Sequence, residues 1–109
     1  MSNFLRRTQK NVGTTPVDVG GYVVPTGKAA TVVGFIITNV TGSTVTANAA
    51  IANSSSVSTY FLANADVAAK TVIIPIGGEQ KVILQAGDSI RVASNTPNAF
   101  DVIMSFVES

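Results

Sequence analysis

The side chains that most often carry out catalysis are either missing from this sequence or stand in patterns that suggest no reaction. The chain contains no histidine and no cysteine, which removes the usual general base, the nucleophilic thiol and the commonest ligands of zinc, copper and iron. None of the six acidic residues has the spacing of a calcium-binding loop; they are Asp18, Asp66, Glu79, Asp88, Asp101 and Glu108. We therefore expect no catalytic residue, no metal site and no cofactor.

Asp88 and Asp101 are the acids that allow two interpretations. A pair of carboxylates is what glycoside hydrolases use. Both residues, however, stand at a turn or a strand end, where an aspartate accepts hydrogen bonds from backbone N–H groups. Residues 86–90, Ala-Gly-Asp-Ser-Ile, also resemble a turn of the cupin barrels, but a metal-dependent cupin needs histidines and is excluded. The sequence thus favours a protein that is not an enzyme.

Tyr60 and Phe61 form the densest aromatic cluster in the chain. Adjacent aromatic rings can serve as a stacking platform for sugars or bases, which makes both residues possible ligand contacts. The chain has no tryptophan and few basic residues nearby, and aromatic side chains are also enriched in cores and subunit interfaces. We favour a core or interface role and keep ligand contact as the alternative.

The surface of the folded protein must be poor in charge. Charged residues make up 12% of the chain, about half the share in typical soluble domains. Such a surface protects poorly against association, so we expect part of it to be buried against other subunits in a homo-oligomer, with a trimer favoured. A monomer coated with Ser, Thr and Asn is the alternative. The net charge of +1 argues against nucleic acid as a partner.

Residues 1–20 are predicted to be an arm that leads into a strand, followed by one β-domain over residues 21–109. In the arm, two large apolar residues adjoin a basic cluster; these are Phe4, Leu5, Arg6, Arg7 and Lys10. The arm is either a frayed terminus or an anchor that places Phe4 and Leu5 on a neighbouring subunit. We see no secretory signal and no apolar run long enough to span a membrane. We therefore expect no membrane partner, and synthesis and assembly in the cytoplasm.

Residues 79–94 are predicted to form a β-hairpin around which the rest of the chain is organised. Val82 and Leu84 would share one face of the first strand, while Ile90 and Val92 alternate with polar residues in the second. The turn would lie at residues 86–88, because Gly87 tolerates a positive φ and the Asp88 carboxylate can accept backbone N–H groups.

Further short strands are expected, with turn signals every 8–12 residues. We place strands at residues 21–25, 31–40, 44–51, 59–62, 71–75 and 100–108, turns at 41–43, 77–78 and 95–98, and a loop or helical turn at 63–70. Residues 32–37 are apolar on both faces, as in a strand covered on both sides. About eight or nine strands of this kind indicate an all-β, antiparallel β-sandwich of jelly-roll or immunoglobulin-like topology.

Several of these turn motifs resemble small structural proteins of tailed bacteriophage virions. The resemblance spans roughly residue 21 to the end. It rests on a basic amino-terminal arm followed by residues 24–32 (Val-Pro-Thr-Gly-Lys-Ala-Ala-Thr-Val), 39–43 (Asn-Val-Thr-Gly-Ser), 76–79 (Ile-Gly-Gly-Glu) and 84–92 (Leu-Gln-Ala-Gly-Asp-Ser-Ile-Arg-Val). It implies that the arm reaches a neighbouring subunit, with Phe4, Arg6, Arg7 and Lys10 as contacts. It implies a virion protein that decorates or cements the capsid through contacts with other virion proteins, the major capsid protein among them. A neck, tail or tail-fibre component is the alternative, and such a component could bind a receptor or a carbohydrate.

Overall fold

The protein is a β-sandwich of two antiparallel sheets. The computed structural model describes residues 3–55, 57–77 and 81–109. Over this part of the chain the strands are β1 (Asn3–Val12), β2 (Val17–Asp18), β3 (Ala30–Asn39), β4 (Val45–Ala52), β5 (Ser58–Val67), β6 (Val72–Ile76), β7 (Val82–Leu84), β8 (Ser89–Ser94) and β9 (Phe100–Glu108). The predicted fold class is confirmed.

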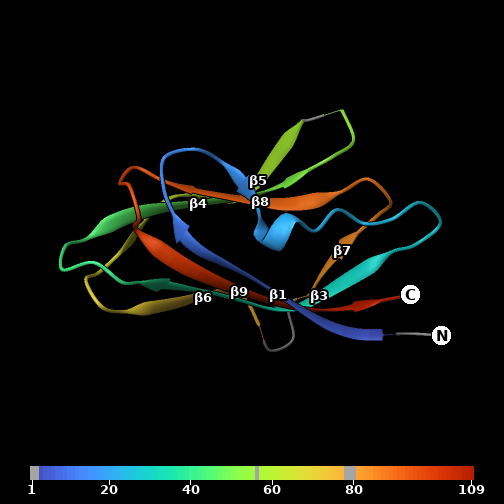
Figure 1. Ribbon diagram of the computed structural model, residues 1–109, viewed down its shortest axis with the longest axis horizontal. Coiled ribbons are helices and arrows are strands. Elements are labelled where there is room, and N and C mark those ends of the chain that lie inside the picture. The colour runs from blue at the N-terminus through green and yellow to red at the C-terminus, as the bar shows by residue number, and fades with distance from the viewer. Residues whose placement is uncertain (1–2, 56, 78–80) are drawn as a thin grey trace.

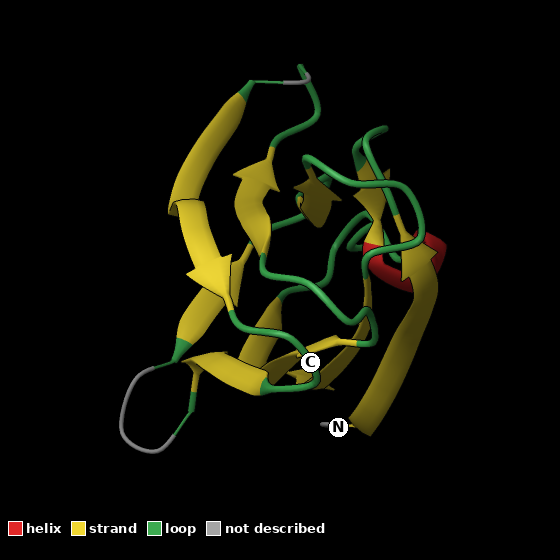
Figure 2. Ribbon diagram, turned by 90° about the vertical axis from the view of Figure 1, so that its left-hand side faces the viewer, coloured by secondary structure: helices red, strands yellow, loops and turns green. Residues whose placement is uncertain are grey.

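The two sheets have five and four strands. In the first, which we call sheet A, the order is β1-β9-β3-β6, and β7 pairs with the other end of β3. The second, sheet B, has the order β2-β8-β4-β5. Figure 1 shows β4 and β8 in one layer, with β9, β3 and β6 in the layer below it. A helical turn, η1 (Val19–Gly21), is drawn in red in Figure 2.

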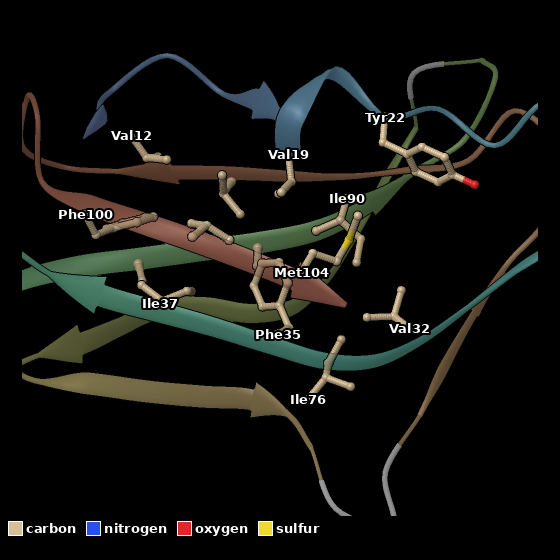
Figure 3. Close-up of a cluster of buried hydrophobic side chains, with 14 of the residues drawn as sticks. Val12, Val19, Tyr22, Val32, Phe35, Ile37, Ile76, Ile90, Phe100 and Met104 are labelled. Atoms are coloured by element: carbon tan, nitrogen blue, oxygen red, sulfur yellow. The ribbon is translucent and has the colours of Figure 1, made fainter. Parts of the chain in front are cut away.

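The core lies between the two layers and is built by the alternation of each strand. Strand β9 buries every second residue, so Phe100, Val102, Met104 and Phe106 face the core. Figure 3 shows Phe35 and Ile37 of β3 meeting Met104 and Phe100 in this space. These four side chains belong to sheet A, and Ile90 and Val92 of β8 in sheet B are buried in the same cluster. The joint burial of side chains from both sheets holds the layers together.

The N-terminal segment is a strand of the sandwich, not a separate arm. Strand β1 pairs antiparallel with β9 from Asn3 to Val12, so it forms one edge of sheet A. Most of its side chains are exposed and only Val12 is fully buried. The boundary expected at residue 20 therefore does not divide an arm from a domain, because β9 supplies the backbone partners of this segment.

The predicted hairpin is wrong in its pairing and right in its turn. Strand β7 belongs to sheet A and β8 to sheet B, so residues 85–88 cross from one layer to the other. The turn has the expected chemistry: Gly87 adopts a φ of +89°, and the Gln85 N–H donates to Asp88 Oδ2 at 2.9 Å. The turn at 41–43 likewise joins β3 to β4, which lie in different sheets.

Two other predicted segments differ from the structure. Residues 22–25 form no strand; Val24 instead exchanges two backbone hydrogen bonds with Gly87 and Asp88. Residues 63–67, expected as a loop or helical turn, continue β5. The strand persists because it bulges at Asn64, whose φ is +49° and whose N–H donates to Asn48 Oδ1 at 2.8 Å.

Three further expectations concern the turn at residues 77–78, the outer face of β3 and membrane-spanning segments. The predicted turn at 77–78 and the start of the 79–94 segment reach into residues 78–80, outside the described residues. Strand β3 is apolar on both faces as expected, but within the described chain no second layer covers its outer face, where Val33 and Ile36 are partly exposed. No helix in the described part of the chain is long and apolar enough to cross a membrane.

Candidate functional site

The two outer faces of the sandwich differ in chemistry, and each contains some of the residues singled out above. The face of sheet A that points away from the core carries a set of large, exposed apolar side chains, with Arg6, Asp101 and Ser105 among them. The corresponding face of sheet B is polar, with Tyr60 at its edge. Each face follows from strand register, because residues that pair across strands point to the same side of a sheet.

The outer face of sheet A, which we call the apolar face, carries large aliphatic and aromatic side chains on all five strands. Six of them define it: Phe4 on β1, Ile103 on β9, Val33 and Ile36 on β3, Ile74 on β6 and Ile83 on β7. Phe4 is 84% exposed, Ile83 66%, Ile74 61% and Ile103 41%. Single exposed apolar residues are ordinary, but several on one side of a sheet make that side a candidate interaction surface.

Strand β1 divides the five predicted arm residues between its two sides. Phe4 pairs with Val107 and Arg6 with Ser105, both of which point outward, so these two residues belong to the apolar face. Leu5 and Arg7 pair with the buried Phe106 and Met104, and point inward. The alternation of β1 therefore separates residues that the sequence suggested would act together. Lys10 is exposed and lies within the bulge of β1, between Gln9 and Val12.

Arg7 is already engaged within the chain. Its guanidinium lies over the Tyr22 ring at 5.4 Å from the centroid, and its Nη1 donates to the Gly20 carbonyl at 3.3 Å. Tyr22 in turn donates from its hydroxyl to Glu108 Oε2 at 2.7 Å. The pKa of Tyr22 is raised, first by burial and then by the hydrogen bond and charge of Glu108, while Arg7 acts in the opposite direction. Arg7 thus fastens η1 to β1, and Phe4 and Arg6 are better placed to meet a partner.

Tyr60 lies beside a hollow of about 420 Å³ on the outer face of sheet B. Its wall carries polar groups that can donate and accept hydrogen bonds: Asn48, Ser58, Asn64 and Arg91. Three small side chains also line it, those of Ala50, Ala63 and Ala93. Arg91 is oriented by an ion pair from its Nε to Asp18 Oδ1 at 3.0 Å, and the same carboxylate oxygen accepts the Ser89 hydroxyl at 2.7 Å. We call this site the Tyr60 hollow.

Phe61 is separated from Tyr60 by the same alternation. Tyr60 is 62% exposed, whereas Phe61 packs against the core with its ring edge-to-face on Phe35 at 5.7 Å between centroids. The structure therefore places Phe61 in the core, as favoured from the sequence, and leaves Tyr60 free to contact a ligand or partner. The two cannot form one stacking platform.

Sequence reasoning did not single out the residues that complete these surfaces. Ile103 and Ile74 lie in the strands predicted at residues 100–108 and 71–75, and the apolar residues beside them were the available signal. Asn48 and Arg91 reach the Tyr60 hollow from β4 and β8, and no local pattern predicts that these two strands pair. Among the described residues no cluster of His, Cys, Asp and Glu side chains could hold a metal ion.

Comparison with known proteins adds a likeness of fold. No family model and no curated protein matches the chain. Among solved structures, the chain is similar to one described as Bacillus endospore appendages that form a novel family of disulfide-linked pili, with a TM-score of 0.56 and 9% sequence identity. The match covers 99% of this chain and 85% of the other. At that identity the likeness concerns the fold alone, and this chain has no cysteine with which to form a disulfide.

Proposed function

We propose that this chain is a non-enzymatic structural protein that acts by packing against other protein subunits. The observation that carries the proposal is the apolar face, where Phe4, Ile74, Ile83 and Ile103 are all substantially exposed on one side of sheet A. Leaving such a set in water is unfavourable by about 25 cal/mol per Å² of apolar surface. A partner that covers the face recovers this free energy, and no chemistry is needed for that role.

The particle we propose is the virion of a tailed phage, with the chain decorating or cementing the capsid after assembly in the host cytoplasm. Support comes from the resemblance of the turns at residues 39–43 and 84–92 to small virion proteins. The similar fold of the endospore appendage protein, which forms pili, adds an example of such a sandwich in a repeating assembly. A neck or tail position is the alternative within the same proposal.

The proposal is tested on purified particles of the phage that encodes the chain. Particles banded in a density gradient should contain the chain at a fixed, high copy number, and particles lacking it should lose their contents at a lower temperature. A copy number of only a few per particle would favour the neck or tail. Absence of the chain from intact particles would contradict a virion role.

A second candidate function is carbohydrate binding, and the Tyr60 hollow is the observation that favours it. An exposed aromatic ring beside amide and hydroxyl groups suits a sugar ring, which offers an apolar face and a rim of hydroxyls. A glycan array probed with the wild-type chain and with Tyr60→Ala is the test. Signals that disappear in the variant would support this function, and an array without signal would count against it.

A further inference from the structure

We infer that the apolar face is covered by the same face of a second copy of this chain, in a two-fold dimer packed sheet A against sheet A. The inference rests on the proposed structural function and names a partner for it.

The area is sufficient for a stable dimer. Sheet A is four strands wide, because β6 and β7 lie end to end along β3. With strands about 4.8 Å apart and a ten-residue strand about 33 Å long, its flat area is about 600 Å². Specific interfaces bury at least about 600 Å² on each partner. Side chains that project from the sheet increase the area beyond the flat value.

Of the two outer faces of the sandwich, the apolar face of a second copy is the better partner for the apolar face. The outer face of sheet B presents Asp18, Arg91, Asn48 and Asn64, so it would desolvate polar groups against an apolar partner without replacing their hydrogen bonds. Among the surfaces built by the described residues, the apolar face of another copy matches in both area and character. A contact of one patch with the same patch is isologous, and it closes as a two-fold dimer.

The shape of the face also suits a second copy. Beside Phe4, Val33 and Ser105 lies a shallow hollow of about 300 Å³, next to Gly34, which has no side chain to fill it. On the same face Ile74 and Ile83 project into solvent. A face with both a hollow and projecting side chains can interlock with its own copy, each filling the other.

Electrostatic repulsion between copies is weak. The chain has a net charge of +1, and the outward side of the sheet includes both Arg6 on β1 and Asp101 on β9. Two copies that meet over this face therefore bring charges of both signs together. The low charge content that first suggested association is thus consistent with contact between identical chains.

The first experiment measures mass in solution against concentration, for the purified full chain. The wild type should sediment with twice the 11.2 kDa of one chain. Ile103→Glu, which places a carboxylate in the middle of the face, should raise the dissociation constant of the dimer at least about 100-fold. Val57→Glu is the matched control, because Val57 is 58% exposed in the loop between β4 and β5, and it should leave the dimer unchanged.

A second experiment asks which face is covered, and uses the absence of natural cysteines. A thiol introduced by Ser105→Cys should react with a maleimide more slowly as the protein concentration rises, by about 10-fold when the dimer is full. Ser58→Cys, on the outer side of sheet B, should react at a rate independent of concentration. Both variants keep a small side chain at a strand position, so we expect both to fold as the wild type does.

Three results would overturn the inference. They are a wild type that stays monomeric up to millimolar concentration, a defined trimer, or a dimer in which Ser58→Cys and not Ser105→Cys is protected. None of these decides the proposed virion role, which depends on whether the chain is found in particles. A monomer that still bands with particles would mean that a different virion protein covers the apolar face.

Discussion

The hydroxyl of Tyr22 donates a 2.7 Å hydrogen bond to Glu108 Oε2, and so ties the segment after η1 to the last residue of β9. The centroids of the Tyr22 and Phe106 rings lie 4.4 Å apart, and the Arg7 guanidinium lies over the Tyr22 ring. Strand β1, the residue that follows η1, and β9 therefore meet at one side chain. The contacts of Tyr22 therefore connect β1, the edge strand of sheet A, to the core.

The stability of the fold should fall in alkali because of Tyr22. Its pKa is raised by burial and by Glu108, while an unfolded tyrosine titrates near about 10. Below pH about 10 both states hold the proton and the contribution is complete. Above it the unfolded chain loses the proton and the folded chain keeps it, so the free energy of unfolding decreases by at most about 1.4 kcal/mol per pH unit.

The measurement is urea unfolding between pH 7 and pH 11 for the wild type and Tyr22→Phe. The variant lacks the titrating hydroxyl, so its stability should decline less steeply above pH about 10. Lysines titrate in the same range in both proteins, which makes the difference between the two curves the informative quantity. Parallel curves would mean that Tyr22 does not couple proton release to unfolding.

The alternation of the strands could be predicted from the sequence, and their partners could not. In β9, Val102 and Met104 have a spacing of two that fixes which side is buried whichever strand lies beside them. Residues 82–84 and 89–94 show the same spacing, and it predicts their faces correctly. It is equally compatible with a hairpin and with two strands in different sheets, because pairing is decided by long-range packing.

For the candidate site too, the alternation of residues between the two faces of a strand could be predicted from the sequence, and the strand pairing could not. Because Tyr60 and Phe61 are adjacent in a strand, their side chains must point to opposite faces of the sheet. Which of the two points to the core depends on the pairing of β5 with β4, and that pairing includes register shifts. The outer apolar residues were visible as apolar runs at 32–37 and 102–104. That no layer of the described chain covers them is a property of the whole fold.

Asn39 should be one of the least replaceable polar residues. It is fully buried, and its Nδ2 donates to the carbonyls of Ser43, Val67 and Ala68 at 2.8, 2.9 and 3.1 Å. Asn39→Ala removes these three hydrogen bonds and also the acceptor of the Thr41 N–H, Asn39 Oδ1. Although the Ser43 and Ala68 carbonyls keep donors on Thr41 and Thr71, the loss of several buried hydrogen bonds should lower the free energy of unfolding by about 3 kcal/mol. Asn53→Ala is the control, since Asn53 caps an exposed loop, and should cost about 1 kcal/mol or less. Similar urea midpoints for the two variants would contradict this reading.

Gly20 and Gly21 should respond differently to the same substitution. Both have positive φ, +59° and +71°, so alanine costs about 1 kcal/mol at either position. A Cβ at Gly20 would also lie 2.9 Å from Arg7 Cβ, while one at Gly21 meets nothing within 4 Å. Gly20→Ala should therefore be the more destabilising, and should weaken the contact of β1 with η1. Equal melting temperatures would show that β1 moves aside without cost.

Phe61→Ala and Tyr60→Ala should change the free energy of unfolding by different amounts, although the two positions are adjacent. Phe61 packs edge-to-face on Phe35 at the margin of the core, so its truncation should lower the free energy of unfolding by about 3 kcal/mol. Tyr60 is mostly exposed, so its truncation should change stability by no more than about 0.5 kcal/mol.

Binding should show the opposite order in the same two variants. If the Tyr60 hollow holds a ligand, Tyr60→Ala loses the ring that faces it and binding fails in a protein of normal stability. Phe61→Ala should bind normally at temperatures where it is folded, because its ring lies on the core side of β5. Calorimetry with any glycan that the array identifies, on both variants at 10 °C, makes the comparison. Loss of binding in Phe61→Ala alone would place the contact on the wrong side of this strand.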